Sequence, residues 1–422
     1  MSADAKREPM YRLRPGADAI AAAVPGAPAL DLGDGIWMSS GLSNSYMLRT
    51  ANGRVIVNCG MGFEGPYHRA GFDAVDPSPV HTIILTQGHP DHLGGVDSFR
   101  EPATHIVTHE NFRIFRDDFE RLMPFRQRNS AFAWAEKLQV VFARAGKARH
   151  ELPPQSRPEP TQTFSDRLEL TIGERRLTLL STPGGETTDA CVVWLPESRT
   201  LISGNVLGPL FGHVPNLVTV RGDRYRDALD YVASVDRLRA LKPARMITGH
   251  FDPIEGEEVI EDELRRLRDA TQWVHDRVVE GMNAGTDVHT MMRDVQLPPE
   301  LDVGEGYGKT AWNVRAIRET YAGWFHHRST TELYAMPFAA VAPDLVQAAG
   351  ADALVAAARR RLDAGEPVAA IHVTDVVLAA EPENAAARRV AADAHLALLA
   401  GATNFWERAW LTKRLAELGD GA

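Results

Sequence analysis

A series of short apolar segments between residues 54 and 250 constrains the fold of this chain more than any other feature of its sequence. The segments are rich in β-branched residues and read RVIVN, HTIILT, HIVTH, LELTI, RLTLLST, ACVVWL, TLISGN and ARMITGH in chain order. Turn residues separate them, and a few stretches between them have helical spacing. Runs of this length and composition are typical of β-strands. The sequence therefore predicts a sheet-rich α/β domain.

Helical periodicity is clearest in two stretches. The segment YRDALDYVASVDRLRAL predicts a helix with one apolar face. The members of that face are Leu229, Val232, Val235 and Leu238. A longer helix is predicted from Glu257 to Met282, because the pattern stops near Gly285 and glycine commonly follows the last turn of a helix.

The character of the chain changes after the loop DVQLPPELDVGEGYG. From Lys309 onward strand signals largely vanish, and Gly365-Glu366-Pro367 and the segment 381–384 divide an Ala-rich region into helices of about fifteen residues. We therefore predict two domains, an α/β domain over residues 1–290 and an all-α helical domain over residues 291–422.

Composition excludes several classes of partner. The chain has 422 residues, 44% of them hydrophobic, and can bury a substantial core. Its net charge of −10, without a long Lys/Arg run, argues against nucleic acid as a partner. No run of about 18 uncharged apolar residues occurs, so we expect no membrane partner. The stretch MSADAKREPMYRLRPGADAI lacks the apolar core of a signal peptide, which predicts a cytoplasmic protein.

One predicted strand runs directly into a loop of potential metal ligands. TIILTQGHPDHLGG carries His89, Asp91 and His92 before a glycine pair. Imidazole and carboxylate side chains gathered at a strand end are what a zinc or iron ion requires. Surface histidines and an aspartate that caps the next helix would produce the same sequence pattern, so the motif alone is only moderately specific.

Three later segments repeat the arrangement of an apolar strand followed by a polar residue. Glu186 follows a strand in STPGGETTDA, Asn205 follows one in LISGNVLG, and His250 follows one in MITGHFDP. With these motifs the chain resembles the metallo-β-lactamase superfamily, whose loop reads Thr-His-x-His-x-Asp-His-x-Gly-Gly. The resemblance implies an αββα sandwich.

A narrower resemblance is to the alkyl sulfatase branch of that superfamily. It rests on TPGGETTDA, on NLVTVRGD with Arg221, and on YGKTAWNVRAIRETYAGWF, which is similar to the segment that opens the dimerisation domain of alkyl sulfatases. The resemblance implies a homodimer whose helical domain, 291–422, is the dimerisation domain.

The resemblance also implies two metal subsites. The first would comprise Gln87, His89 and Glu186, and the second would comprise Asp91, His92 and His250, with Asn205 in the bridging position. Gln87 stands where the superfamily has histidine, and its amide oxygen is a weak ligand for zinc. Asn205 lacks the negative charge that would offset two dications, which at about 4 Å and an effective dielectric near 20 repel by roughly 16 kcal/mol. We therefore expect a secure second subsite and a doubtful first one.

Four further residues are candidates for substrate binding or catalysis. Arg221 and Arg128 could clamp an anionic group through bidentate hydrogen bonds, although either could form a surface or interdomain salt bridge instead. Trp312 stands where alkyl sulfatases have a histidine thought to serve the leaving group, so it could form an aromatic wall or pack in an interface. His213 could replace the missing imidazole or act as a base, or serve only as a loop histidine.

The leading hypothesis is a metal-dependent hydrolase that attacks an ester-like bond, such as a sulfate ester, of a small, anionic or aromatic organic substrate. Zinc is the expected metal, as one or two ions, with iron or manganese as alternatives. Asp91 and His213 are the catalytic candidates. Two histidines and one carboxylate are also the ligand set of non-haem iron sites, so an iron-dependent oxygenase or a metal-assisted lyase is the alternative. A catalytically silent protein that serves binding is a third hypothesis.

Overall fold

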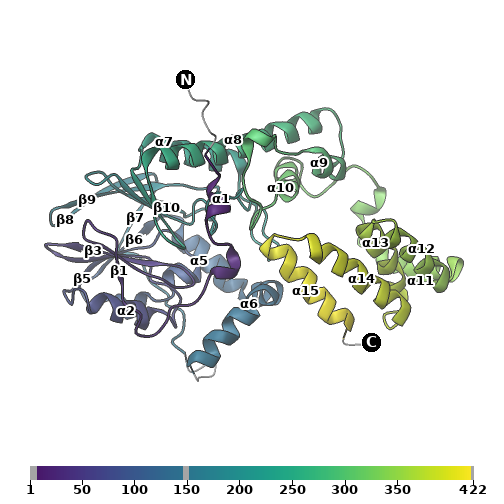
Figure 1. The fold of residues 1–422 in the computed structure, drawn as a ribbon, viewed down its shortest axis with the longest axis horizontal. Helices are drawn as coiled ribbons and strands as arrows, with labels where there is room; N and C mark the ends of the chain where they lie inside the picture. The colour runs from purple at the N-terminus through teal and green to yellow at the C-terminus, as the bar shows by residue number, and fades with distance from the viewer. Residues whose placement is uncertain (1–6, 146–151, 420–422) are drawn as a thin grey trace. The chain divides into compact units, whose positions relative to one another are not determined.

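The computed structural model describes residues 7–145 and 152–419, which form two compact units divided between Tyr321 and Ala322 (Figure 1). The first unit holds every predicted strand. Its first sheet has seven strands in the order β1 to β7, of which β1 to β4 are antiparallel neighbours and β4 to β7 are parallel neighbours. The strands are β1 (Leu30–Asp31), β2 (Ile36–Ser39), β3 (Ser45–Thr50), β4 (Gly53–Val57), β5 (Val80–Ile84), β6 (His105–His109) and β7 (Gln162–Phe164).

The second sheet has six strands in the order β13-β12-β11-β10-β9-β8. Only β11 and β12 run parallel to one another, and the other neighbours are antiparallel. The strands are β8 (Arg167–Ile172), β9 (Arg175–Ser181), β10 (Cys191–Leu195), β11 (Thr200–Gly204), β12 (Arg245–Thr248) and β13 (Ile254–Glu255).

Helices cover the outer faces of both sheets, and the sheets pack on each other. The core between the sheets includes Tyr46, Val55, Leu179, Val193 and Ile247, all fully or almost fully buried. Figure 1 places α2 (Gly65–Asp73) and α5 (Phe112–Arg121) by the first sheet and α7 (Ala228–Ala240) and α8 (Glu257–Asn283) by the second. The predicted αββα sandwich is confirmed.

The first unit contains further helices. They are α1 (Met10–Leu13), α3 (Pro90–Leu93), α4 (Val96–Phe99), α6 (Met123–Ala145), α9 (Val288–Asp294) and α10 (Thr310–Ala322), with 3-10 turns at Ala17–Ala19 and Pro299–Leu301. The prediction for α8 is accurate to one residue at its end. In α7 the predicted face is only partly right. Val232, Val235 and Leu238 are buried, but Leu229 is 41% exposed because it lies in the first turn, where Asp227 accepts its backbone N–H.

The second unit is helical, as predicted. It contains α11 (Ala342–Ala349), α12 (Ala351–Asp363), α13 (Pro367–Ala380), α14 (Ala385–Gly401) and α15 (Phe405–Gly419), with 3-10 turns at Thr330–Leu333 and Phe338–Val341. The predicted interruptions fall between α12 and α13 and between α13 and α14. The domain boundary after residue 290 stays a prediction. The two compact units divide after Tyr321, and apolar side chains of α9 and α10 pack with those of α8 in the first unit.

No single helix in the described part of the chain is long and apolar enough to span a bilayer. One bent pair, Phe338–Ala349 with Ala351–Asp363, meets the length and composition test only when both helices are taken together.

Candidate metal and anion site

The loop after β5 is held in place by the side-chain amide of Asn58, which accepts one hydrogen bond from the loop and donates another to it. Asn58, which follows β4, accepts the backbone N–H of Thr86 with its Oδ1 at 3.0 Å and donates to the Thr86 hydroxyl from its Nδ2 at 3.0 Å. The N–H of Cys59 donates to the carbonyl of His92 at 2.7 Å. Gly95 is required here, because a Cβ at this position would lie 2.1 Å from the carbonyl oxygen of Cys59. Backbone packing therefore fixes where the side chains of the loop begin.

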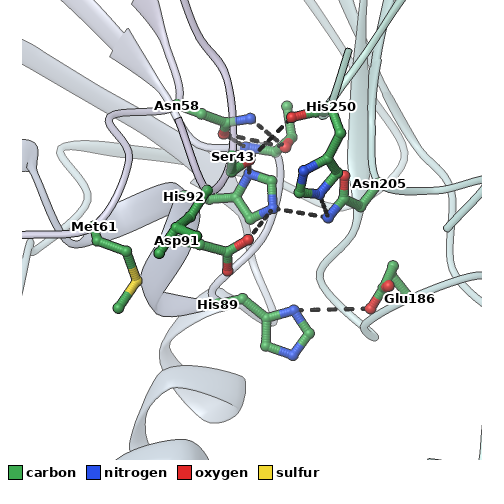
Figure 2. A network of polar contacts seen from close by, with 12 residues as sticks. Ser43, Asn58, Met61, His89, Asp91, His92, Glu186, Asn205 and His250 are labelled. Carbon is green, nitrogen blue, oxygen red and sulfur yellow. Dashed lines mark hydrogen bonds and ion pairs between the residues drawn. The ribbon is translucent and has the colours of Figure 1, made fainter. Parts of the chain in front are cut away.

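The donors of the second predicted subsite gather around one amide. Asp91 and His92 lie on α3, Asn205 follows β11 and His250 follows β12, so three separate loops meet at this point (Figure 2). The Nδ2 of Asn205 lies 3.2 Å from the Nε2 of His92 and 3.2 Å from the Nε2 of His250. Asp91 Oδ2 lies 3.5 Å from the Nε2 of His92. The Nδ1 of His92 faces the hydroxyl of Ser43 at 3.3 Å, which orients the ring.

Burial keeps this donor set in the protonation state that a metal requires. It lowers the pKa of His92 and lowers the pKa of His250 to about 4, so both rings are neutral near pH 7. Burial would raise the pKa of Asp91, but the neighbouring His92 and His89 outweigh it and the pKa lies below its usual value. Two neutral imidazoles and a carboxylate are suitable ligands for zinc and for iron.

The side chains of the second subsite are suitable ligands for a divalent ion, but their arrangement is too open to surround one. Ligand atoms at about 2.1 Å from a tetrahedral ion lie about 3.4 Å from one another, close to the spacings of Asp91, His92 and Asn205. Among the described residues, however, no three His, Cys, Asp or Glu side chains are arranged tightly enough to hold an ion. The amide nitrogen of Asn205 faces the Nε2 atoms of both imidazoles. A half-turn of that amide would present its Oδ1, which is buried and makes no hydrogen bond within the described residues.

The first predicted subsite is occupied by guanidinium groups. The Nδ1 of His89 lies 3.8 Å from Glu186 Oε2, and Figure 2 shows the two side chains facing each other. Arg226 donates to the same carboxylate oxygen at 2.8 Å, and Arg221 Nη2 lies 3.3 Å from the Nε2 of His89. Both amide atoms of Gln87 are buried and have no hydrogen-bond partner in the described part of the chain. These contacts bring His89 and Glu186 together but give both of them cationic partners.

The charges of this subsite favour an anion over a second metal ion. Asp223 forms ion pairs with Arg126 at 2.5 Å and with Arg221 at 3.1 Å. Burial would raise the pKa of Asp223, but Arg221 outweighs it and holds the pKa well below its usual range. Together with the Arg226–Glu186 pair, these ion pairs bring three guanidinium groups into the subsite. A dication placed among them would be repelled by each of these positive charges.

His89 is a poor centre for a second metal. Burial, assisted by the positive charge of Arg221, lowers the pKa of His89 to about 3, so the ring is neutral. Its Nε2 faces Arg221, and its Nδ1 faces a carboxylate that is already paired. We conclude that the first subsite does not fit a metal as the second one does.

The buried guanidinium of α6 belongs to Arg126, a residue that the sequence motifs did not single out. Arg128, the predicted anion clamp, is exposed on that helix, whereas Arg126 is only 6% exposed and pairs with Asp223. A spacing of two residues puts the pair on different sides of a helix, and the letters RQR do not say which side faces the site. A role for Arg128 stays a prediction.

His213 and Trp312 are the two other predicted site residues. The Nδ1 of His213 accepts the backbone N–H of Gly306 at 2.7 Å, and burial lowers its pKa to about 4. Trp312 is half-buried, with the ammonium of Lys309 5.8 Å from its ring centroid. The proposed roles of His213 and Trp312 stay predictions. Tyr307, which the sequence did not suggest, is 7% exposed, and its electrostatic partners include Arg221.

The segment that holds the two subsites matches a known family. A family model described as the metallo-beta-lactamase superfamily covers residues 39–250. The chain belongs to this superfamily. A second family model, alkyl sulfatase dimerisation, covers residues 287–421 of this superfamily member. The resemblance inferred from the motifs is confirmed, and the superfamily implies the use of a divalent metal.

Curated relatives of this superfamily member include alkylsulfatases. It is 32% identical over 300 residues to the linear primary-alkylsulfatase of a Pseudomonas species, covering 66% of this chain and 56% of that protein. It is 26% identical over 343 residues to an alkyl/aryl-sulfatase of Saccharomyces cerevisiae, covering 75% of this chain and 51% of that protein. The chain therefore spans about half the length of these relatives.

The fold of this superfamily member is similar to that of a stereoselective inverting sec-alkylsulfatase from a Pseudomonas species. The TM-score is 0.76 at 22% identity, and the match covers 94% of this chain and 66% of that one. At this identity the likeness concerns the fold alone.

Proposed function

We propose that this protein hydrolyses an ester-like bond in a small organic anion, a sulfate ester or a related compound, with one divalent metal ion in the second subsite. The observation that carries the proposal is the pairing of two unlike subsites. Neutral imidazoles and a carboxylate meet at Asn205, and beside them lies a group of three largely buried guanidiniums. The relatives named as alkylsulfatases support the sulfate ester as the first substrate class to test.

Asp91, His92 and His250 would hold the metal. Zinc is the proposed ion, with iron or manganese as alternatives. When bound, such an ion polarises an ester oxygen and lowers the pKa of water towards neutrality. Ser43 fixes the ring of His92, and the Asn205 amide sets the separation of His92 and His250. The chain's own contribution is thus a set of donors that loses no proton on binding the ion near pH 7.

Arg221 would bind the anionic group of the substrate. Its guanidinium is 17% exposed, in contrast to the more deeply buried Asp223, and its Nη2 reaches towards His89. A planar guanidinium matches two oxygens of a sulfate. Asp223 fixes the Nε edge of Arg221 at 3.1 Å, so the orientation of the fork is set before substrate arrives.

We also propose that the protein is a homodimer in the cytoplasm that acts on a small molecule. The match to the dimerisation family supports the dimer. Large apolar side chains exposed in the second unit support it as well. They are Trp324, Leu333, Tyr334, Met336 and Phe338, each at least 60% exposed.

The test combines metal content with turnover. Purified protein is analysed for zinc, iron and manganese and assayed with 4-nitrophenyl sulfate and hexyl sulfate. We expect about one metal per chain, hydrolysis of at least one ester, and loss of both after His250→Ala. His105→Ala is the matched control, because His105 is exposed at the start of β6. Turnover that persists in metal-free protein, or metal bound with no hydrolysis of either ester, would reject the proposal.

A further inference from the structure

One face of α5 carries three phenylalanines towards the first subsite. Phe112, Phe115 and Phe119 are spaced by three and four residues and so lie on the same side of the helix. Phe112 is fully buried in the core of the first sheet. Phe115 and Phe119 are only partly buried. The apolar stripe thus begins in the core and ends at an accessible surface.

The accessible end of that stripe lies against His89. The ring centroids of Phe115 and His89 are 5.0 Å apart with an interplanar angle of 82°, and those of Phe119 and His89 are 6.1 Å apart with an angle of 76°. Both are edge-to-face contacts of the kind that aromatic pairs prefer. Gly88 permits this approach, since a Cβ there would lie 2.9 Å from Phe115 Cδ1.

The same two rings adjoin the guanidinium groups of the anion subsite. The Arg126 guanidinium lies 4.6 Å from the centroid of Phe119 and pairs with Asp223. Arg221 pairs with the same Asp223 and faces the Nε2 of His89. An apolar wall and an anion clamp therefore meet at one imidazole.

We propose that Phe115 and Phe119 form the wall that receives the organic part of the substrate, and that the substrate class is an ester anion with an aromatic or extended apolar group. This inference rests on the proposed function for the anion's position at Arg221. An anionic group at Arg221 leaves the attached carbon skeleton beside His89, where these two rings offer a partly buried apolar surface. Trp312, which the sequence nominates for an aromatic wall, has the ammonium of Lys309 5.8 Å from its ring centroid, and its role in the wall stays a prediction.

Binding of non-hydrolysable sulfonates tests the inference without turnover. The dissociation constants of benzenesulfonate and methanesulfonate are measured calorimetrically for the holoenzyme, for Phe115→Ala/Phe119→Ala and for Ile114→Ala. Ile114 is 59% exposed on the same helix and serves as the matched control. We expect wild type and the control to bind benzenesulfonate at least tenfold more tightly than methanesulfonate. The double variant should show less than a threefold preference, with methanesulfonate affinity unchanged within twofold.

A second pair of variants distinguishes a loss of folding from a loss of the aromatic wall. Phe115→Leu and Phe119→Leu keep apolar volume but remove the ring, and each should reduce the preference by about threefold while thermal unfolding stays cooperative. Equal affinity of wild type for both sulfonates, or an unchanged preference in the leucine variants and the double variant, would overturn the inference. Hydrolysis of 4-nitrophenyl sulfate is assayed separately. Its absence alongside a retained benzenesulfonate preference would count against the proposed reaction and leave the wall supported.

Discussion

Arg226 donates to Glu186 at 2.8 Å, and both side chains are only 5% exposed. A buried ion pair of this kind is costly to break, because removal of one partner leaves an uncompensated charge away from water. We expect Arg226→Met to lower the free energy of unfolding by about 3 to 5 kcal/mol. Urea unfolding of the two proteins at pH 7.5 measures the difference.

The double variant Arg226→Met/Glu186→Gln controls for the lost packing of the arginine side chain. It should recover at least half of the loss, because a neutral amide is less costly to bury than a lone carboxylate. A double variant as unstable as Arg226→Met would show that Glu186 is not the group left unpaired.

Metal stoichiometry follows from the contrast between the two subsites. We expect about one equivalent in wild type and in Gln87→His, because Arg221 and Arg226 keep their positive charges beside His89 and Glu186. In Gln87→His/Asn205→Asp the added carboxylate offsets the repulsion between two dications, and the content should approach two. Elemental analysis after dialysis against a zinc buffer measures all three. Two equivalents in wild type would contradict the charge argument.

Much of the fold could be read from the sequence because the strands of the inner layers are short, apolar and β-branched. β5, β10, β11 and β12 were all predicted within about one or two residues. The metal loop could be read because its donors are contiguous. In contrast, β1 to β3 are not predicted, since β1 consists of two exposed residues and β2 and β3 lack the β-branched runs of the other strands.

The anion subsite could be predicted only in part. Arg221 stands in a motif, but Arg126 and Asp223 are recognisable only once α6 is packed against the loop after β11. Local propensity is the same for an inward and an outward arginine on a helix, so tertiary contacts alone separate Arg126 from Arg128. The same holds for Phe115 and Phe119, whose spacing predicts an apolar face but not what that face contacts.

Asp223 is expected to position the anion clamp. Asp223→Asn removes the charge that holds Arg221 and Arg126, and we expect KM for a sulfate ester to rise at least tenfold while kcat falls less than threefold. Asp118→Asn is the control, since Asp118 forms ion pairs with Arg224 and Arg121 instead. Steady-state kinetics over a range of salt concentrations measures both. A fall in kcat alone, with KM unchanged, would argue against this role.

The exposed apolar residues of the second unit predict that two chains associate. Charged substitutions at these residues should disrupt the dimer. Trp324, Tyr334 and Phe338 are 65%, 69% and 70% exposed, and surfaces of this kind commonly mark protein interfaces. We expect wild type to scatter light as a species of twice the 46.4 kDa chain mass. Phe338→Asp together with Tyr334→Asp should shift the population to single chains at micromolar concentration. A wild-type monomer at the same concentration would refute the dimer.

Glu64 predicts a pH dependence of stability. Its Oε1 accepts the N–H groups of Ala23 and Leu42 at 2.8 Å each, and its Oε2 accepts that of Met61 at 3.0 Å. Burial raises the pKa of Glu64 to about 7 although these three bonds act in the other direction. The folded state therefore binds a proton more tightly than the unfolded state, whose carboxyl titrates near 4.5.

The sign of the effect follows from proton linkage. Between pH 4.5 and 7 the folded state holds more protons, so the free energy of unfolding falls as pH rises through this window and then levels off above the folded pKa. The full change is about 3 kcal/mol at 1.36 kcal/mol per pKa unit. Glu64→Gln cannot titrate, and its unfolding free energy should lack this part of the slope. Urea unfolding from pH 4.5 to 8.5 measures the slope, with Glu258→Gln as a control because that side chain is 92% exposed. Parallel pH profiles for wild type and Glu64→Gln would show that the carboxyl of Glu64 is ionised in both states across the window.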